Sequence, residues 1–253
     1  MYMTDIAPKS RFRSVLDMVA SACTIGIAAL AVVVVYRGGV LGGAVQAPRQ
    51  QAKPRPEPPV PTTPVSLTGA NTRGSATAKV ALIEYSDFEC PYCGKFARET
   101  LPTIEKEFVD KGSVLFAFRH LPLERIHTHA LGAATAAECA AMQGQFWAAH
   151  DYLFQHQDRL AKDDVVQAAA SLNLDPRALA GCIDAATPAR KIKADTESAD
   201  QLQISGTPAF FLGTITADGK VRVMQRLSGA QPVETFRQVL QTLLTSAGDR
   251  KGN

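Results

Sequence analysis

The pattern of apolar and polar residues after residue 78 predicts a β-α-β unit. The run KVALIEYSDF, at 79–88, is mostly apolar and rich in strand-forming residues, which is typical of a buried strand that ends in a turn. The next segment should be a helix with one apolar face, because its pattern repeats every four residues, at Phe96, Thr100, Ile104 and Phe108. Pro102 lies inside this helix and should kink it. A second buried strand is predicted at 113–121, and the order of elements favours a parallel crossover connection.

Residues 127–203 show almost no strand pattern and are predicted to be helical. Their first part is rich in alanine, and Gly144 is the expected break within it. Further helices should begin near Asp163, at Pro176 and at about Pro188.

The C-terminal part returns to strands. Residues 208–213 and 220–229, with a turn at Asp218-Gly219 between them, predict a β-hairpin. A last helix should open at Pro232 and bury Phe236, Val239, Leu240, Leu243 and Leu244. Residues 65–253 are therefore predicted to form one α/β domain, in which a helical insertion separates a β-α-β half from a β-β-α half.

The N-terminal region contains a segment that is long enough to cross a bilayer. Residues 18–36 read MVASACTIGIAALAVVVVY, nineteen positions without a charge. Lys9, Arg11 and Arg13 precede this segment, and such a basic flank is expected on the cytoplasmic side. The sequence thus predicts a cytoplasmic tail at 1–17 and a transmembrane anchor at 18–36.

A cleaved signal peptide is the alternative for this region. Cleavage would follow Ala47, but Pro48 should hinder a peptidase, and the apolar stretch is longer than the core of a usual signal. The uncleaved anchor is therefore favoured, and either interpretation exports the rest of the chain.

Residues 37–64 are predicted to be a spacer. The stretch at 48–64 holds seven prolines in seventeen positions, so it can neither pair into a sheet nor continue a helix. Extended polyproline geometry, at about 3 Å per residue, would hold the domain some 50 Å from the bilayer. Composition alone does not separate a working spacer from a disordered stretch without a task.

Charge and cysteine content narrow the class of protein. Residues 1–64 carry seven Lys or Arg against three Asp or Glu, and the remainder is near neutral, so the predicted domain lacks the clustered basic residues of a nucleic-acid-binding protein. Cys23 lies in the apolar segment. The other four cysteines are an even set, which fits an oxidising compartment; they are Cys90, Cys93, Cys139 and Cys182.

Cys90-Pro91-Tyr92-Cys93 stands where the first predicted strand meets the helix. The first turn of a helix has unpaired N–H groups and the positive end of the helix dipole, and both stabilise a thiolate at Cys90. A lower pKa makes this sulfur a nucleophile near neutral pH and a better leaving group. Asp87 and Glu89 act in the opposite direction on the Cys90 pKa, and the sequence does not decide which influence is larger.

Other chemistry at this motif is less favoured. A c-type haem site needs histidine where the sequence has Gly94, and a zinc site needs a second closely spaced ligand pair, whereas Cys139 and Cys182 are 43 residues apart. A purely structural disulfide between Cys90 and Cys93 would constrain very little chain. A redox pair is therefore favoured, and no metal or other cofactor is expected.

The stretch EYSDFECPYC at 84–93, followed by ISGTPAFFLG at 204–213, resembles the thioredoxin superfamily. The helical insertion between the two stretches makes the chain similar to the DsbA-like disulfide oxidoreductases of bacterial envelopes. The resemblance covers 65–253. It implies a thioredoxin-like fold with an inserted helical domain, preceded in this chain by the N-terminal transmembrane helix.

The resemblance also implies roles for three residues of the reaction. Cys90 matches the attacking cysteine, Cys93 the resolving cysteine and Glu84 the interior carboxylate of the family. Glu84 could relay a proton to or from Cys93 as the disulfide opens. A glutamate on a strand can also lie on an exposed face, but its apolar neighbours favour the interior.

Four further residues are expected to contact a client protein. Pro208 matches the cis-proline that lies beside the disulfide in the family, and the backbone of Thr207 would then be free to bind an extended client segment. Pro91 and Tyr92 lie between the two cysteines, where side chains flank the reactive sulfur and tune its redox potential.

Cys139 and Cys182 are expected to form a structural disulfide. Two free thiols would be unusual in an oxidising compartment, and some relatives carry a second disulfide in this region. Two buried thiols or a regulatory redox pair are the alternatives.

The predicted function is thiol–disulfide exchange with exported proteins through Cys90 and Cys93, with the chain acting as the oxidant. The resemblance implies reduced exported proteins as substrates and a quinone-linked membrane partner that reoxidises the pair. The anchor would place the protein in the inner membrane, with its catalytic domain in the periplasm or an equivalent space. A tethered reductase or isomerase, and a peptide-binding or chaperone module without turnover, are the alternatives.

Overall fold

The computed structural model describes residues 59–249, which belong to one compact unit. The predicted tail, the apolar segment at 18–36 and most of the predicted spacer lie outside the described residues. Within the described range, no helix combines the length and the apolar character that a membrane span requires.

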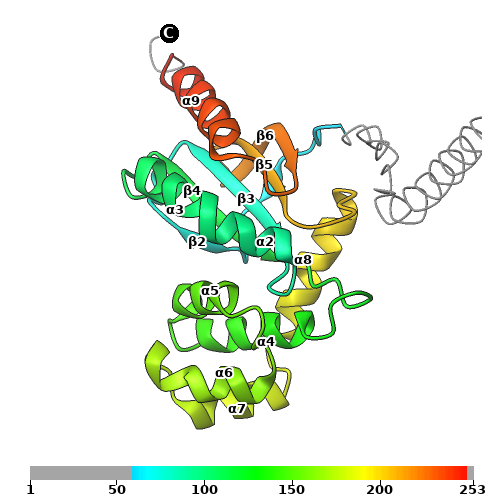
Figure 1. The fold of residues 1–253 in the computed structure, drawn as a ribbon. Coiled ribbons are helices and arrows are strands. Elements are labelled where there is room, and N and C mark those ends of the chain that lie inside the picture. Colours follow the sequence, from blue (N-terminus) through cyan, green and yellow to red (C-terminus); the bar gives the residue numbers. More distant parts are fainter. Residues whose placement is uncertain (1–58, 250–253) are drawn as a thin grey trace, which may run out of the picture. The chain divides into compact units, whose positions relative to one another are not determined.

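A mixed sheet of six strands forms the centre of this unit (Figure 1). In chain order the strands are β1 (Val65–Ser66), β2 (Asn71–Arg73), β3 (Val80–Ser86), β4 (Val114–His120), β5 (Ala209–Ile215) and β6 (Lys220–Ser228). Their order in space is β1-β6-β5-β3-β4-β2. β3 and β4 run parallel, whereas β5 pairs antiparallel with both β3 and β6. The predicted parallel crossover and the predicted hairpin are therefore both confirmed.

The two edge strands were not predicted from the sequence. β2 pairs antiparallel with β4, so that Thr72 lies opposite Ala117, and β1 pairs with the start of β6. Both strands are short, and β2 has no buried residue. Their conformation depends on partners far along the chain, which a local pattern does not reveal.

A single run of helical residues leads from β3 to β4. Its segments are α2 (Pro91–Lys95), a π-helical stretch (Phe96–Thr100), α3 (Leu101–Ile104) and a second π-helical stretch (Glu105–Val109). Pro102 was expected to kink this helix. The first π-helical stretch ends at Thr100, the N–H of the following Leu101 bonds to the carbonyl of Phe96, and Pro102 occupies the first turn of α3. A proline is tolerated in a first turn because its missing N–H would have no partner there.

The region between β4 and β5 is helical, as predicted. Its helices are α4 (Ala130–Ala141), α5 (Phe146–Gln155), α6 (Lys162–Ala168), a 3₁₀ turn (Ala169–Leu172), α7 (Pro176–Asp184) and α8 (Ala189–Gln201). Gly144, with φ of +76°, lies in the turn between α4 and α5, where the break was expected. Helices α4 to α7 form a layer of their own, while α8 packs against β4 of the sheet (Figure 1).

The two faces of the sheet are buried under different helices. On one face, α3 and α9 (Val233–Asp249) cover alternate residues of β3, β4 and β5, and Phe96 and Phe236 both pack against Phe210. On the opposite face, Ala199 of α8 joins a cluster with Ile83 and Phe211. β3 ends and α2 begins at the edge of the sheet that faces the helical layer, where α2 contacts α5 (Figure 1).

Buried charges join α8 and α4 to the end of β4. Arg119 donates to Asp195 at 2.5 Å, and His120 pairs with Glu138 at 2.7 Å. Lys191 also contacts both carboxylates. These polar side chains are buried and paired with one another, so the network fixes where the two helices meet the strand.

Candidate active site

The turn after β3 is held by the side chain of Asp87. Its Oδ1 accepts the backbone N–H of Glu89 at 2.9 Å, and its Oδ2 accepts the N–H of Leu123 at 2.8 Å. The same Oδ2 lies 2.7 Å from Nδ1 of His127. Asp87 therefore joins the cysteine-bearing turn to the loop that follows β4. This contact with His127 was not predicted from the sequence, because it spans 40 residues.

Cys90 and Cys93 are free thiols in this structure. Cys90 precedes the first residue of α2, and Pro91 occupies the first turn, where a missing N–H has no cost. The side chain of Cys90 is 5% exposed and that of Cys93 is 0% exposed, so Cys90 is the more accessible of the two although largely covered. The Cys90 thiol lies 3.5 Å from the carbonyl oxygen of Thr207.

The surroundings of Cys90 favour its thiolate. The Cys93 thiol, which donates to the Cys90 sulfur, is the largest cause that lowers the Cys90 pKa, to about 5, and the backbone N–H groups of Tyr92 and Cys93 act in the same direction against the effect of burial. The acidic residues Asp87 and Glu89 were expected to oppose this shift. Both carboxylates instead bond to the chain around residues 123–129, and the net shift of the Cys90 pKa is downward, with the Cys93 thiol as its largest cause.

Cys93 and Glu84 favour their protonated forms. Burial, together with the bond to Cys90, raises the pKa of Cys93. Burial also raises the pKa of Glu84, which is 0% exposed on β3, to about 8, while the neighbouring Ser86 hydroxyl acts against the shift. Within the described part of the chain, neither carboxylate oxygen of Glu84 has a hydrogen-bond partner of good geometry. The interior therefore holds an acid that can give up a proton near neutral pH, next to the thiol that must gain one.

The segment before β5 completes the site. The bond between Thr207 and Pro208 is cis, and β5 begins at the next residue. A cavity of about 200 Å³ lies beside it, lined by Ile204, Ser205, Gly206, Thr207, Pro208, Ala209, Arg226, Ser228 and Gly229. Tyr92, between the two cysteines, is 65% exposed and so presents its ring to the solvent.

The other cysteine pair lies in the helical layer. Cys139 of α4 and Cys182 of α7 form a disulfide, with their Cα atoms 5.8 Å apart. Cys139 is buried in the cluster that includes Cys90 and Cys93. No group of three or more potential metal ligands occurs in the range 59–249.

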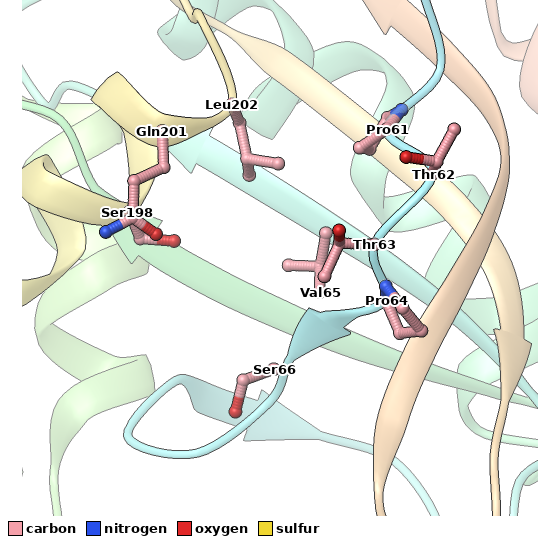
Figure 2. Close-up of a pocket in the computed structure, with 9 residues that line it drawn as sticks. All are labelled: Pro61, Thr62, Thr63, Pro64, Val65, Ser66, Ser198, Gln201 and Leu202. Carbon is pink, nitrogen blue, oxygen red and sulfur yellow. The ribbon is translucent and has the colours of Figure 1, made fainter.

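A larger cavity lies away from the thiols. It measures about 490 Å³ and is lined by residues 61–66 on one side and by Ser198 and Gln201 of α8, with the following Leu202, on the other (Figure 2). The Ser198 hydroxyl is already bonded to the hydroxyl of Tyr85 at 2.7 Å. The cavity includes none of the residues predicted to act in the reaction.

A family model described as Thioredoxin matches residues 67–238, more than half of the chain. The chain belongs to this thioredoxin family. Among solved structures, the α-DsbA1 protein of Wolbachia pipientis matches with a TM-score of 0.65 and 26% identity, over 74% of this chain and 96% of that protein. BdbD of Bacillus subtilis matches with a TM-score of 0.65 and 22% identity over 74% of this chain and 100% of BdbD, and this shows likeness of fold. Together with the family match, these similarities show that the chain shares the fold of DsbA-like thiol–disulfide oxidoreductases.

The curated relatives are parts of much larger proteins. The Na(+)/H(+) antiporter NhaA 3 of Salinispora tropica is 42% identical over 142 residues, which are 56% of this chain and 21% of the antiporter. The antiporter NhaA of Herminiimonas arsenicoxydans is 32% identical over 169 residues, 67% of this chain and 25% of that protein. The chain thus spans about a quarter or less of the length of these relatives.

Replacing Glu84 with glutamine should stabilise the reduced protein by about 3 kcal/mol at pH 7 and by almost nothing at pH 4.5. The folded protein keeps the Glu84 proton up to a pKa of about 8, whereas the unfolded chain loses it above about 4.5. Stability of the natural protein therefore falls as the pH rises through this window, and glutamine removes that dependence. Urea unfolding of both proteins at several pH values measures the difference.

The matched control for this prediction is Glu124→Gln, which changes an exposed carboxylate on the loop after β4. Its unfolding free energy should follow that of the natural protein at every pH. An equal gain for Glu84→Gln at pH 4.5 and at pH 7 would contradict the raised pKa.

Proposed function

We propose that the chain oxidises reduced, exported proteins by thiol–disulfide exchange at Cys90 and Cys93. The observation that carries this proposal is the opposite charge preference of the two sulfurs: Cys90 is stabilised as the thiolate and Cys93 as the thiol. A stabilised thiolate makes the reduced pair more stable relative to the disulfide, and the disulfide is then a stronger oxidant.

The reaction transfers two electrons from the client to the pair. A client thiolate attacks the Cys90 sulfur of the disulfide, the sulfur–sulfur bond breaks, and Cys93 leaves as a thiolate that takes a proton from Glu84. A second client thiolate then attacks the client sulfur of the mixed disulfide. Cys90 leaves as the stabilised thiolate, and the client keeps the new disulfide.

The client binds in extended form beside Pro208 in this proposal. Main-chain groups of Thr207 pair with the client segment as an added strand would, and the cavity of about 200 Å³ accepts a side chain next to the reacting cysteine. The exposed ring of Tyr92 adds apolar contact on the other side of the sulfur. Such contacts are largely independent of client sequence, which suits an enzyme that must release unrelated products.

The proposal places the enzyme at the inner membrane. Residues 18–36 anchor the chain as a single span, the proline-rich spacer carries the domain into the periplasm or an equivalent compartment, and a quinone-linked membrane partner reoxidises the pair. The apolar length of the anchor, its basic flank and the DsbA-like fold of the domain support this placement.

The midpoint potential of the Cys90–Cys93 pair tests the direction of the reaction. We expect a value between about −200 and −120 mV for the soluble domain equilibrated with glutathione buffers, measured from the fraction of oxidised protein. The midpoint potentials of protein disulfide isomerase and DsbA are about −180 and about −120 mV, and that of thioredoxin is about −270 mV. A value near that of thioredoxin would instead identify a tethered reductase, and the absence of any exchange would identify a binding module.

A further inference from the structure

The side chain of Gln157 connects the helical layer to the turn that carries the reactive cysteine. Gln157 lies in the turn that follows α5. Its Nε2 donates to the carbonyl oxygen of Phe88 at 2.7 Å and to that of Cys90 at 2.9 Å. One amide group therefore bonds to the carbonyls of the two residues that flank Glu89. The second of these residues is Cys90, which carries the reacting sulfur.

The orientation of this amide is fixed by its partners. Arg98, in the helical run that follows the cysteines, donates to Oε1 of Gln157 at 3.1 Å, and its guanidinium also bonds to the carbonyl of Phe154. The nitrogen thus faces two acceptors and the oxygen faces a cation. If the amide nitrogen and oxygen exchanged places, the oxygen would face the carbonyls of Phe88 and Cys90 and the nitrogen would face the Arg98 guanidinium. All three contacts would then be unfavourable, so the Nε2 donors must point at the two carbonyls.

Gly94 provides the space that this arrangement needs. A Cβ atom at Gly94 would lie 2.0 Å from Oε1 of Gln157 and 2.6 Å from Nη1 of Arg98. The residue directly after Cys93 therefore has no side chain, and the glutamine amide occupies that position against the first turn of the helix. In the sequence, Gly94 served only to exclude a c-type haem site, and this packing role was not predicted.

We propose that Gln157 is a positioning residue, which holds the first turn of α2 so that its N–H groups point at the Cys90 sulfur. The carbonyl of Cys90 also accepts the N–H of Gly94 at 3.1 Å and so belongs to the first hydrogen bond of the helix. A second donor on the same carbonyl fixes the plane of that peptide and strengthens the polarisation of the turn. The N–H groups of Tyr92 and Cys93 are then kept in place to stabilise the thiolate.

The inference rests on Cys90 as the reacting thiol but is independent of the direction of the reaction. The titratable groups that act on Cys90 are Cys93 in the same helix and Glu84 on β3, and Arg98 is the charged group at Gln157. A neutral substitution at Gln157 alters none of these charges, whereas a carboxylate at this position would add a charge beside Arg98. A change in the titration of Cys90 in a neutral variant therefore reports on the turn itself.

Two substitutions test this role in the reduced protein. Gln157→Glu replaces both donors with a charged acceptor of the same shape, and Gln157→Met keeps the volume but removes both donors. We expect the thiolate absorbance of Cys90 at pH 5 to fall by about fivefold in Gln157→Glu, which corresponds to a rise of one unit in its pKa, and by about twofold in Gln157→Met. The midpoint potential in glutathione buffers should become more reducing in the same order.

Gln155→Glu, at the exposed end of α5, adds the same charge two residues away and should titrate like the natural protein. Variants that melt at a lower temperature but show an unchanged Cys90 titration would overturn the proposal, because they would show a structural role alone. If Gln157→Glu does not fold, Gln157→Met decides. A reducing potential in the natural protein would contradict the oxidant role and leave the assignment of Gln157 standing.

Discussion

Replacing Cys90 with alanine should reduce the rate of dithiol oxidation by at least about a thousandfold, because the sulfur that forms the mixed disulfide is removed. Replacing Cys93 with alanine should instead leave a reactive Cys90 without its resolving thiol. This variant, mixed with a peptide that contains a disulfide, should retain one half of the peptide as a mixed disulfide at Cys90. Mass spectrometry of the unreduced protein detects this adduct and its position.

The two cysteines are distinguished by their surroundings rather than by their spacing. The Cys90 thiolate lies at the start of α2, and Cys93 is completely buried. The Cys93→Ala variant should also have a higher Cys90 pKa than the natural protein, because the thiol that donates to the Cys90 sulfur is missing. An adduct at position 93 in a Cys90→Ala variant would contradict the assignment of roles.

Removing the disulfide in the helical layer should lower the free energy of unfolding by about 4 kcal/mol in the variant Cys139→Ala, Cys182→Ala. The bond closes a loop of 43 residues that contains α5 and α6, and without it the unfolded chain gains conformational freedom. Urea unfolding of the oxidised natural protein and of the variant, under identical conditions, measures the loss.

The same variant separates a structural disulfide from a regulatory one. Cys139 lies in the interior of α4, whereas Cys182 is only partly buried. For a structural bond, oxidation of a client peptide and the midpoint potential of Cys90 and Cys93 should stay unchanged at temperatures where the variant is folded. The matched control, Cys90→Ala with Cys93→Ala, should lose activity and keep most of its stability. A shifted midpoint potential in the first variant would instead indicate that the two pairs are coupled.

The contact between the two layers explains why these effects should be separable. Phe88 packs against Phe154 of α5 at 4.8 Å between ring centroids, and the cluster around them contains both the reactive pair and Cys139. The disulfide itself joins α4 to α7, and α7 lies on the far side of α4 from the sheet (Figure 1). Loss of the disulfide should therefore loosen α6 and α7 before it disturbs the turn at Cys90.

Local sequence was sufficient for the main elements of the fold. β3 and β4 are mostly apolar because both of their faces are buried, and the helix between them repeats at the spacing of one apolar face. The order of these elements limits the connection to a parallel crossover. The motif from Cys90 to Cys93 falls at the start of a helix, and the chemistry of a helix terminus follows from that position alone.

The sequence could not predict what distant segments bring to the site. Asp87 and Glu89 read as charges that oppose the thiolate, but the structure engages them with the loop at 123–129, and the pKa of Cys90 is lowered. Gln157 looked like one polar residue among many at the end of a helix. Its role depends on a contact across 67 residues with the carbonyl of Cys90.

The chain by itself determined which residues are buried and which sulfur is placed to react, because periodicity and helix polarity act over one or two turns. Only the tertiary structure decided how strongly that sulfur is ionised and which groups hold it. Electrostatic stabilisation depends on distances of a few ångströms between atoms, and those distances are set by how β3, β5 and the helical layer pack together.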